Sequence, residues 1–267
     1  MAVDKKYIIG VDIGGSKINA IIFNNALPAS GQGNVLKKIK IPTPKNLKEF
    51  LEKLEALIEN LISYAGGKKI SGIGCGLAGA MDLKKGNILN APNLRFLNNF
   101  NIKNWLEEKF DLYVKIDNDA RCFTRAEYLL GFGRGYQNIV GITFGTGIGG
   151  GIIIDGKIFY GANNSAGELG HMVLNSEKDW EFLMLKQVKD LEKNLGIGFA
   201  NIINILDPEI IVISGGASSM LKSLLPEAKK IMNKFIISPK SKKNVKIING
   251  KLGENAGAIG AAALFYE

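Results

Sequence analysis

The stretch Ile8-Ile9-Gly10-Val11-Asp12-Ile13-Gly14-Gly15-Ser16-Lys17 is the most informative segment of this 267-residue chain for its fold. Its apolar, β-branched beginning is typical of a buried strand, and this strand runs directly into an acid and two glycines. Glycine lets a turn approach a ligand closely, and successive backbone N–H groups can bind phosphate oxygens. A carboxylate at a strand end can hold hydrated Mg²⁺. Taken alone, however, the pattern is more often an ordinary hairpin turn.

A second glycine-rich stretch, Gly141-Ile-Thr-Phe-Gly-Thr-Gly-Ile-Gly-Gly-Gly151, repeats this pattern downstream. It lies between two apolar strands, and the second strand ends at a hairpin turn, Asp155-Gly156. Each glycine loop leads into a strand and lacks Gly-Lys-Ser/Thr, so neither fits the Rossmann or Walker pattern. The two stretches therefore predict two phosphate-binding hairpin turns, one in each half of the chain.

The rest of the chain reads as two α/β halves. We expect strands at 7–13, 17–24, 34–41, 70–77, 114–116, 138–144, 148–154, 157–160 and 209–213, and helices at 46–65, 121–130, 179–205, 217–235 and 254–266. Three strands followed by a helix and a strand occur twice, which indicates an internal duplication. Gly196 and Gly198 lie inside the expected helix 179–205. They predict either a break there or close packing against the sheet or a neighbouring chain.

Composition indicates a cytoplasmic protein. The chain is 46% hydrophobic, yet none of its apolar runs reaches the roughly 18–20 residues that span a bilayer. Residues 1–6 have no signal-peptide h-region, and Cys75 and Cys122 are expected to be buried free thiols. The net charge of +9 comes from scattered lysines without interleaved aromatic residues. We therefore expect neither a nucleic-acid nor a membrane partner.

Seven motifs, in this order along the chain, resemble the ROK family of glucokinase-like sugar kinases, within the actin/hexokinase/Hsp70 ATPase superfamily. They are Asp12-Ile-Gly-Gly-Ser-Lys17, Gly76-Leu-Ala-Gly79, Asp117-Asn-Asp-Ala120, Phe144-Gly-Thr-Gly-Ile-Gly149, Gly167-Glu-Leu-Gly-His171, Ile213-Ser-Gly-Gly216 and Glu254-Asn-Ala-Gly-Ala-Ile-Gly260. The resemblance implies a two-lobed, actin-like ATPase (ribonuclease H-like) α/β fold with duplicated βββαβα lobes. Residues 1–117 would form the first lobe and 118–267 the second, with the last helix, 254–266, packing back on the first. Nucleotide and sugar would bind in the cleft between the lobes.

The resemblance also implies the catalytic base. An acid at a helix start is often only a cap, and the residues alone leave both interpretations open. In the family, the Asp of the Asn-Asp pair takes the proton from the sugar 6-hydroxyl, and Asn118-Asp119 occupies that place. Asp117 stands where the family often has Glu, and its role is open.

The remaining site residues follow from the resemblance in the same way. Sugar-binding residues would be Gly79, Asn93, Asn118, Asp119, Glu168, His171 and, from a gapped match, Glu181. ATP-binding residues would be Asp12, Gly14, Gly15, Ser16, Lys17, Gly145, Thr146, Gly147, Gly215 and Gly216, with Asp12 also holding Mg²⁺ through water.

One departure from the family concerns zinc. ROK proteins typically follow the His with a cysteine-rich stretch that binds structural zinc, whereas residues 172–184 contain no cysteine. Because tetrahedral zinc needs four ligands and only His171 remains, we expect no zinc site. Trp180 and Phe182 are then expected to pack inward and hold this segment.

Together these features predict an ATP- and Mg²⁺-dependent kinase for the 6-hydroxyl of a hexose or N-acyl-hexosamine. A sugar-responsive ROK regulator or binding module is the alternative, and it is disfavoured because no DNA-binding segment precedes the first strand. An actin-like or chaperone-like ATPase without a sugar is disfavoured by Glu168 and His171. The resemblance allows a homodimer. The sequence leaves open which sugar is used and whether polyphosphate replaces ATP.

Overall fold

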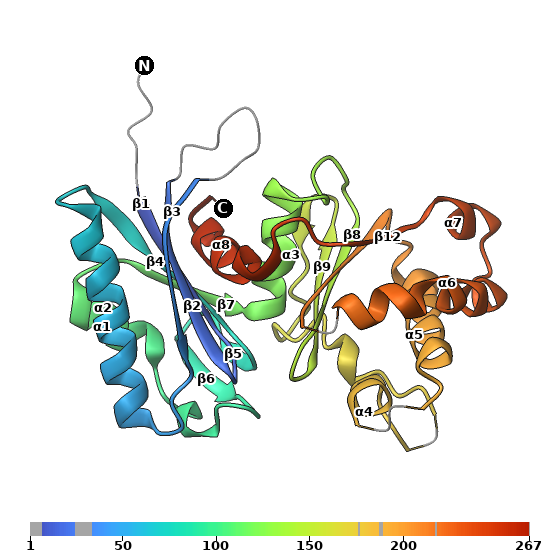
Figure 1. Ribbon diagram of the computed structural model, residues 1–267, viewed down its shortest axis with the longest axis horizontal. Helices are drawn as coiled ribbons and strands as arrows, with labels where there is room; N and C mark the ends of the chain where they lie inside the picture. The colour runs from blue at the N-terminus through green and yellow to red at the C-terminus, as the bar shows by residue number, and fades with distance from the viewer. Residues whose placement is uncertain (1–6, 25–33, 176, 187–188, 217, 267) are drawn as a thin grey trace.

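Two twisted five-stranded sheets stand side by side in the computed structural model, with two helices between them (Figure 1). The structure describes residues 7–24, 34–175, 177–186, 189–216 and 218–266. The first sheet has the strand order β3-β2-β1-β4-β7 and the second the order β10-β9-β8-β11-β12. In each sheet three antiparallel strands are extended by two parallel strands, which is the duplication that the sequence predicts.

The strands occupy the segments where the apolar runs lie. The first sheet consists of β1 (Tyr7–Ile13), β2 (Lys17–Asn24), β3 (Asn34–Pro42), β4 (Ile70–Leu77) and β7 (Val114–Asn118). The second consists of β8 (Ile139–Phe144), β9 (Ile148–Ile154), β10 (Lys157–Ile158), β11 (Ile210–Ser214) and β12 (Lys246–Asn249). A separate small hairpin joins β5 (Ala80–Asp82) to β6 (Asn87–Asn90).

The helices cover both faces of each sheet. They are α1 (Leu47–Ala65), α2 (Ile102–Phe110), α3 (Asp119–Leu130), α4 (Trp180–Leu185), α5 (Leu191–Leu206), α6 (Ser218–Phe235), α7 (Pro239–Asn244) and α8 (Ala256–Ala262). Local sequence sets their ends. The Asn46 side chain accepts a hydrogen bond from the Glu49 N–H at the start of α1, and Gly66 ends that helix with φ of 60°.

Three apolar cores hold the molecule together. One lies between the first sheet and α1 and α2, and a second lies between the second sheet and α4, α5 and α6. The third lies between the two sheets, around α3 and α8, and includes Ile8, Phe23, Phe123, Ile139 and Ile259. Since residues from both halves share this third core, the halves form one packed unit.

Each of the two central helices packs on the sheet that does not contain the strand before it. Helix α3 follows β7 of the first sheet but packs on β8 and β9, whereas α8 follows β12 of the second sheet but packs on β1 and β4. Glycines permit this close approach. A Cβ at Gly74 would overlap the carbonyl oxygen of Ala261 in α8, and a Cβ at Gly141 would overlap the Thr124 hydroxyl in α3.

Most expected elements are confirmed, with two corrections. The expected helix 179–205 is two helices, and the break lies after Leu185, not at the glycines. Gly196 packs against α6, where a Cβ would lie 2.6 Å from the Ala228 carbonyl oxygen, and Gly198 packs against the Trp180 ring. The expected helix 254–266 is α-helical only over α8, with 3₁₀ turns on either side.

Several short elements had no sequence prediction, namely β5, β6, α2, α7 and β12. Residues 1–6, and Ala217 at the start of an expected helix, lie outside the described residues. We place the boundary between the lobes as a proposal after β7, because Asn118 still pairs with Leu77 in the first sheet.

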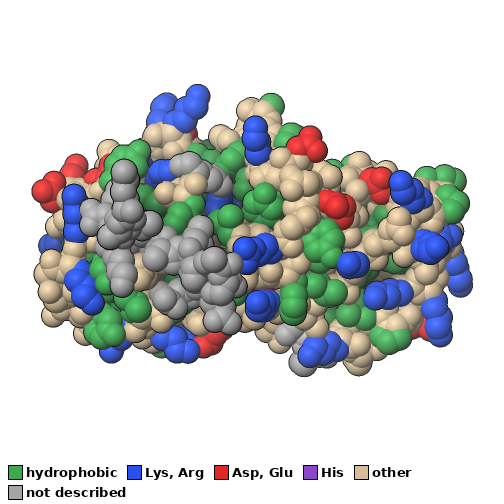
Figure 2. Space-filling model, turned by 90° about the horizontal axis from the view of Figure 1, so that it is seen from above, with side chains coloured by type: hydrophobic (Ala, Val, Ile, Leu, Met, Phe, Trp, Pro, Cys, Tyr) green, Lys and Arg blue, Asp and Glu red, His purple; other side chains and the backbone are tan. Residues whose placement is uncertain are grey.

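The surface and the thiols agree with the composition. Lys and Arg side chains are spread over the face shown in Figure 2, separated by apolar and uncharged side chains. Within the described ranges, Cys75 and Cys122 are buried and free, and no helix is long and apolar enough to cross a membrane.

The contact between Gly74 and α8 makes a stability prediction. Gly74→Ala should lower the free energy of unfolding by about 1–3 kcal/mol, because the added methyl group meets backbone that cannot move aside alone. Urea unfolding measures the change. Gly216→Ala is the control, because its Cβ would have no heavy atom within 4 Å, and should change stability by less than about 0.5 kcal/mol. Equal effects of the two substitutions would contradict the proposed packing constraint.

Candidate active site

A cavity of about 400 Å³ opens between the two halves and is lined by residues from both. It brings together every residue that the resemblance assigns to the sugar and ATP sites, namely Asp12, Gly14, Gly15, Ser16, Lys17, Gly79, Asn93, Asn118, Asp119, Gly145, Thr146, Gly147, Glu168, His171, Glu181, Gly215 and Gly216. These residues are spread over more than two hundred positions of the chain. Their convergence in one cavity makes it the candidate active site.

The two glycine turns face this cavity from opposite halves. Each is closed by one backbone hydrogen bond, from the Gly14 N–H to the Lys17 carbonyl at 3.0 Å and from the Gly145 N–H to the Gly147 carbonyl at 2.9 Å. Glycine is required where the turns touch their neighbours. A Cβ at Gly15 would lie 2.8 Å from that of Asn93, and one at Gly147 would lie 2.6 Å from a Glu181 oxygen.

Asn118 and Asp119 mark the start of α3, and the structure separates their local roles. Asn118 is the cap, since its side-chain oxygen accepts hydrogen bonds from the Ala120 and Arg121 N–H groups at 2.9 and 3.2 Å. Its side-chain amide donates to the Gly79 carbonyl at 3.4 Å. Asp119 accepts one bond, from the Ala120 N–H at 2.9 Å, and lines the cavity. Helix capping therefore explains Asn118, but it does not explain why position 119 is an aspartate.

Burial and the charges of neighbouring carboxylates raise the pKa values of the Asp12 and Asp119 carboxyl groups. Burial raises the pKa of Asp12 to about 7, with a further rise from Asp119 and an opposing effect of Lys17. Burial raises the pKa of Asp119 to about 6. Backbone N–H groups and Arg121 oppose this rise, and Glu168 adds to it. The protein thus leaves these negative charges under-compensated. A hydrated divalent cation would supply the missing positive charge, so the residues fit Mg²⁺.

Glu168, His171 and Glu181 also line the cavity. Glu181 accepts a hydrogen bond from the Ile148 N–H at 2.6 Å, which anchors the carboxylate beside the second glycine turn. The His171 Nδ1 lies 3.1 Å from Asp179, and this contact raises the pKa of His171. Asp179 also caps α4 by accepting a bond from the Phe182 N–H. Asp179 therefore orients the histidine, a role that the sequence did not indicate.

The match to a known family covers nearly the whole chain. The model of the ROK family matches residues 8–181 and 181–267. This chain belongs to the ROK family. Its structure resembles that of a ROK family glucokinase from Streptomyces griseus in complex with glucose and AMPPNP. The TM-score is 0.80 at 25% identity, over 97% of this chain and 98% of the glucokinase. The fold is therefore the two-lobed, actin-like ATPase fold of ROK glucokinases.

Two ROK relatives differ in activity. An N-acetyl-D-glucosamine kinase from Mannheimia succiniciproducens is 29% identical over 97% of this chain and 99% of its own length. A xylose repressor from Caldicellulosiruptor bescii is 27% identical over 96% of this chain but only 77% of its own length. A sugar kinase and a xylose repressor are thus both similar in sequence to nearly the whole of this chain.

Trp180 holds the segment that has no cysteines in this ROK protein. It is fully buried, with its ring edge-on to Phe144 and Phe199 at centroid distances of 5.6 and 6.0 Å. The prediction that Phe182 packs inward is wrong, since that side chain is 41% exposed and its ring lies under Lys178. In the described part of the chain, no group of three or more His, Cys, Asp or Glu residues could hold a metal ion.

Sequence reasoning missed some of the lining. The further residues are Ala78, Pro92, Phe123, Thr143, Ile148, Gly149, Ser214, Gly253, Glu254, Ala256 and Gly257. Several of them lie within the motifs quoted for the resemblance, and there was a separate reason in the sequence to expect two of them at a ligand site. Thr143 and Ser214 are paired polar residues at the ends of parallel apolar strands, and ligands of α/β proteins gather at such ends.

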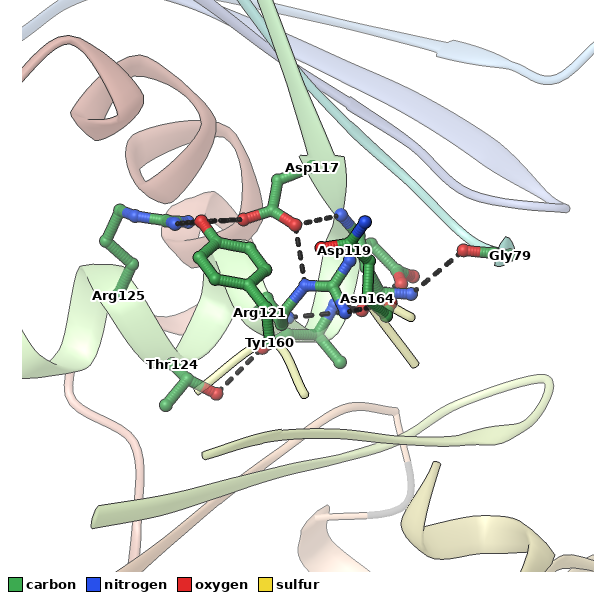
Figure 3. A network of polar contacts seen from close by, with 10 residues as sticks. Gly79, Asp117, Asp119, Arg121, Thr124, Arg125, Tyr160 and Asn164 are labelled. Carbon is green, nitrogen blue, oxygen red and sulfur yellow. Dashed lines mark hydrogen bonds and ion pairs between the residues drawn. The ribbon is translucent and has the colours of Figure 1, made fainter. Parts of the chain in front are cut away.

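A buried polar network underlies the site and assigns a role to Asp117 (Figure 3). Asp117 is fully buried and accepts hydrogen bonds from Arg121 Nε at 2.6 Å, Arg125 Nη2 at 2.9 Å and the Tyr160 hydroxyl at 3.3 Å. It also accepts one from the Asn118 N–H at 2.7 Å. Asp117, Arg121 and Arg125 follow one another at intervals of four residues, a spacing that could have predicted ion pairs among them. No such pairs were predicted from the sequence.

Removing the buried charge of Asp117 should destabilise the protein. Asp117→Asn keeps the side-chain shape but leaves two buried guanidinium groups without their carboxylate, so the free energy of unfolding should fall by about 3–5 kcal/mol. Urea unfolding tests this, with the exposed Asp155→Asn as the matched control. A loss below about 1 kcal/mol would show that the network contributes little to stability.

Proposed function

We propose that this protein is an ATP-dependent kinase that phosphorylates the 6-hydroxyl of a glucose-like hexose or an N-acyl-hexosamine. The observation that supports this best is the position of Asp119. It lines one cavity together with two glycine turns and with Glu168 and His171. The related glucokinase and N-acetyl-D-glucosamine kinase support the same reaction class.

In this proposal Asp119 accepts the proton of the attacking hydroxyl. A general base is most effective when its pKa lies near the working pH. With a pKa of about 6, Asp119 is ionised at neutral pH and is still more basic than an ordinary carboxylate. The Asn118 cap holds the start of α3, so the carboxylate is kept in place as the proton is transferred.

The sugar would bind on the wall formed by both halves. Glu168 and His171 offer directional hydrogen bonds to hydroxyl groups, with Asn93, Asn118 and the backbone at Gly79 on the facing side. Glu181 would bind the anomeric end. Because Asp179 holds Nδ1 of His171, the other ring nitrogen is left to face the sugar.

ATP would bind along the remaining length of the cavity. The N–H groups of the turns at 14–17 and 145–147 would bind phosphate oxygens, and Gly215 and Gly216 would lie against the adenosine. Asp12 would hold hydrated Mg²⁺, which when bound neutralises charge on the phosphates. We also propose that the protein is cytoplasmic, works without zinc and acts on a sugar, not on a nucleic acid or a membrane.

A sugar-responsive regulator is the second candidate, because the xylose repressor is similar in sequence to nearly the whole of this chain. Such a protein needs to bind sugar but not to transfer phosphate. The half-buried aspartate in the cavity, with a pKa raised to about 6, favours the kinase.

The Asp119→Asn substitution tests the proposed base. It keeps the side-chain shape and removes the proton acceptor, so kcat should fall by about 10²–10⁴-fold while the sugar dissociation constant changes little. A coupled assay and calorimetry measure the two quantities. Retention of more than about a tenth of wild-type kcat would remove Asp119 from the mechanism.

The Asp12→Ala substitution tests the proposed metal-binding residue. It should lower kcat and weaken the dependence of the rate on Mg²⁺, with the sugar dissociation constant little changed, because Asp12 would hold the cation and not the sugar. Titration of Mg²⁺ against rate for both proteins measures this. An unchanged Mg²⁺ dependence would show that the first turn is structural.

A further inference from the structure

The loop from Tyr160 to Glu168 connects β10 to the 3₁₀ turn Leu169–His171 and brings Glu168 to the cavity. Its backbone takes unusual conformations, with φ of 71° at Gly161, 57° at Asn164 and 98° at Gly167. Only one backbone bond closes it internally, from the Ala166 N–H to the Tyr160 carbonyl at 3.1 Å. The position of Glu168 therefore depends on what holds this loop from outside.

The end of the loop packs on β9, where Gly167 lies against Gly150, and Arg121 makes a second external contact, in the middle of the loop. Its Nη1 donates a hydrogen bond to the Asn164 carbonyl at 3.1 Å, and its guanidinium lies 5.2 Å from the centre of the Tyr160 ring. The same guanidinium donates through Nε to Asp117, which lies on β7 (Figure 3). The side chain is 3% exposed. Arg121 thus links the loop that ends at Glu168 to the helix turn that presents Asp119.

Arg125 also binds Asp117, but it contacts the loop at a different residue. It binds the second oxygen of Asp117 and is also almost fully buried, at 1% exposed. Arg125 Nη2 donates a hydrogen bond to the Tyr160 hydroxyl at 2.9 Å, at the start of the loop and eight residues before Glu168. Arg121 contacts the loop farther along, at the backbone of Asn164, four residues before Glu168.

We propose that Arg121 is a positioning residue that sets sugar affinity by fixing the loop of Glu168 against the start of α3. This inference rests on the proposed function, in which Glu168 binds the sugar and Asp119 is the base. A planar guanidinium is needed because one group must reach a carboxylate and a carbonyl at fixed angles while stacking on an aromatic ring. A lysine at this position keeps the charge but cannot make all three contacts.

The test compares Arg121→Lys with Arg125→Lys, which both keep a cation beside Asp117. Arg121→Lys should raise the KM and the calorimetric dissociation constant for the sugar roughly tenfold, since small misplacements at a site are costly. The KM for ATP should stay within about twofold of wild type. Arg125→Lys should lower thermal stability about as much as Arg121→Lys does, but it should leave sugar affinity unchanged. Glucose and N-acetylglucosamine are the probes.

Two further measurements keep the test independent of folding and of turnover. Asn164→Ala leaves the buried network intact but strains the loop, because alanine disfavours positive φ, and should also weaken sugar affinity. Hydrogen exchange of amides 161–168 should speed up in Arg121→Lys and not in Arg125→Lys.

Unchanged sugar affinity and unchanged exchange in Arg121→Lys would overturn the positioning role, as would equal effects of the two lysine variants. Faster exchange together with a wild-type protein that phosphorylates no sugar would contradict the proposed function and leave the loop contact standing.

Discussion

The close packing of α3 and α8 between the two sheets is the constraint on which the rest of this structure depends. A Cβ at Gly260 of α8 would overlap the backbone carbonyl of Cys122 in α3, so these helices cross at backbone contact. Gly74 under α8 and Gly141 under α3 allow the same approach to the sheets. Since each helix packs on the sheet that does not contain the strand before it, and the third core draws residues from both sheets, neither half can complete its core alone.

The chemistry of the cavity follows from this crossing. Asp119 is the first residue of α3, and a Cβ at Gly257, in the first turn of α8, would lie 2.5 Å from a carboxylate oxygen of Asp12. The same packing that brings the two carboxylates near each other also excludes water from them. Their raised pKa values, about 7 for Asp12 and about 6 for Asp119, are therefore a consequence of how the halves are joined.

The two glycine turns of the cavity were predictable from local sequence, whereas the other lining residues came from the resemblance to the ROK family. Strand–turn patterns with glycine specify both hairpin turns, and Asn118 ahead of α3 is a strong cap. Other features could not be predicted because they depend on contacts between residues far apart in the sequence or on which face of a helix is buried. Trp180 and Phe182 are two positions apart on a helix, so they face different ways and cannot both enter the core. The glycines of α5 suggested a break, but their cost is offset by contact with Trp180 and α6. The link from Arg121 to Asn164 joins residues 43 positions apart and has no local signal.

The central claim is that this cavity transfers phosphate to a sugar, and product analysis tests it most directly. Purified protein would be incubated with ATP, Mg²⁺ and a panel of hexoses, hexosamines and N-acyl-hexosamines, and the products identified by phosphorus and carbon NMR. The account predicts ADP together with a sugar carrying phosphate on oxygen 6. Saturable sugar binding by calorimetry with no phosphorylated product from any member of the panel would contradict it and favour a sugar-binding regulator.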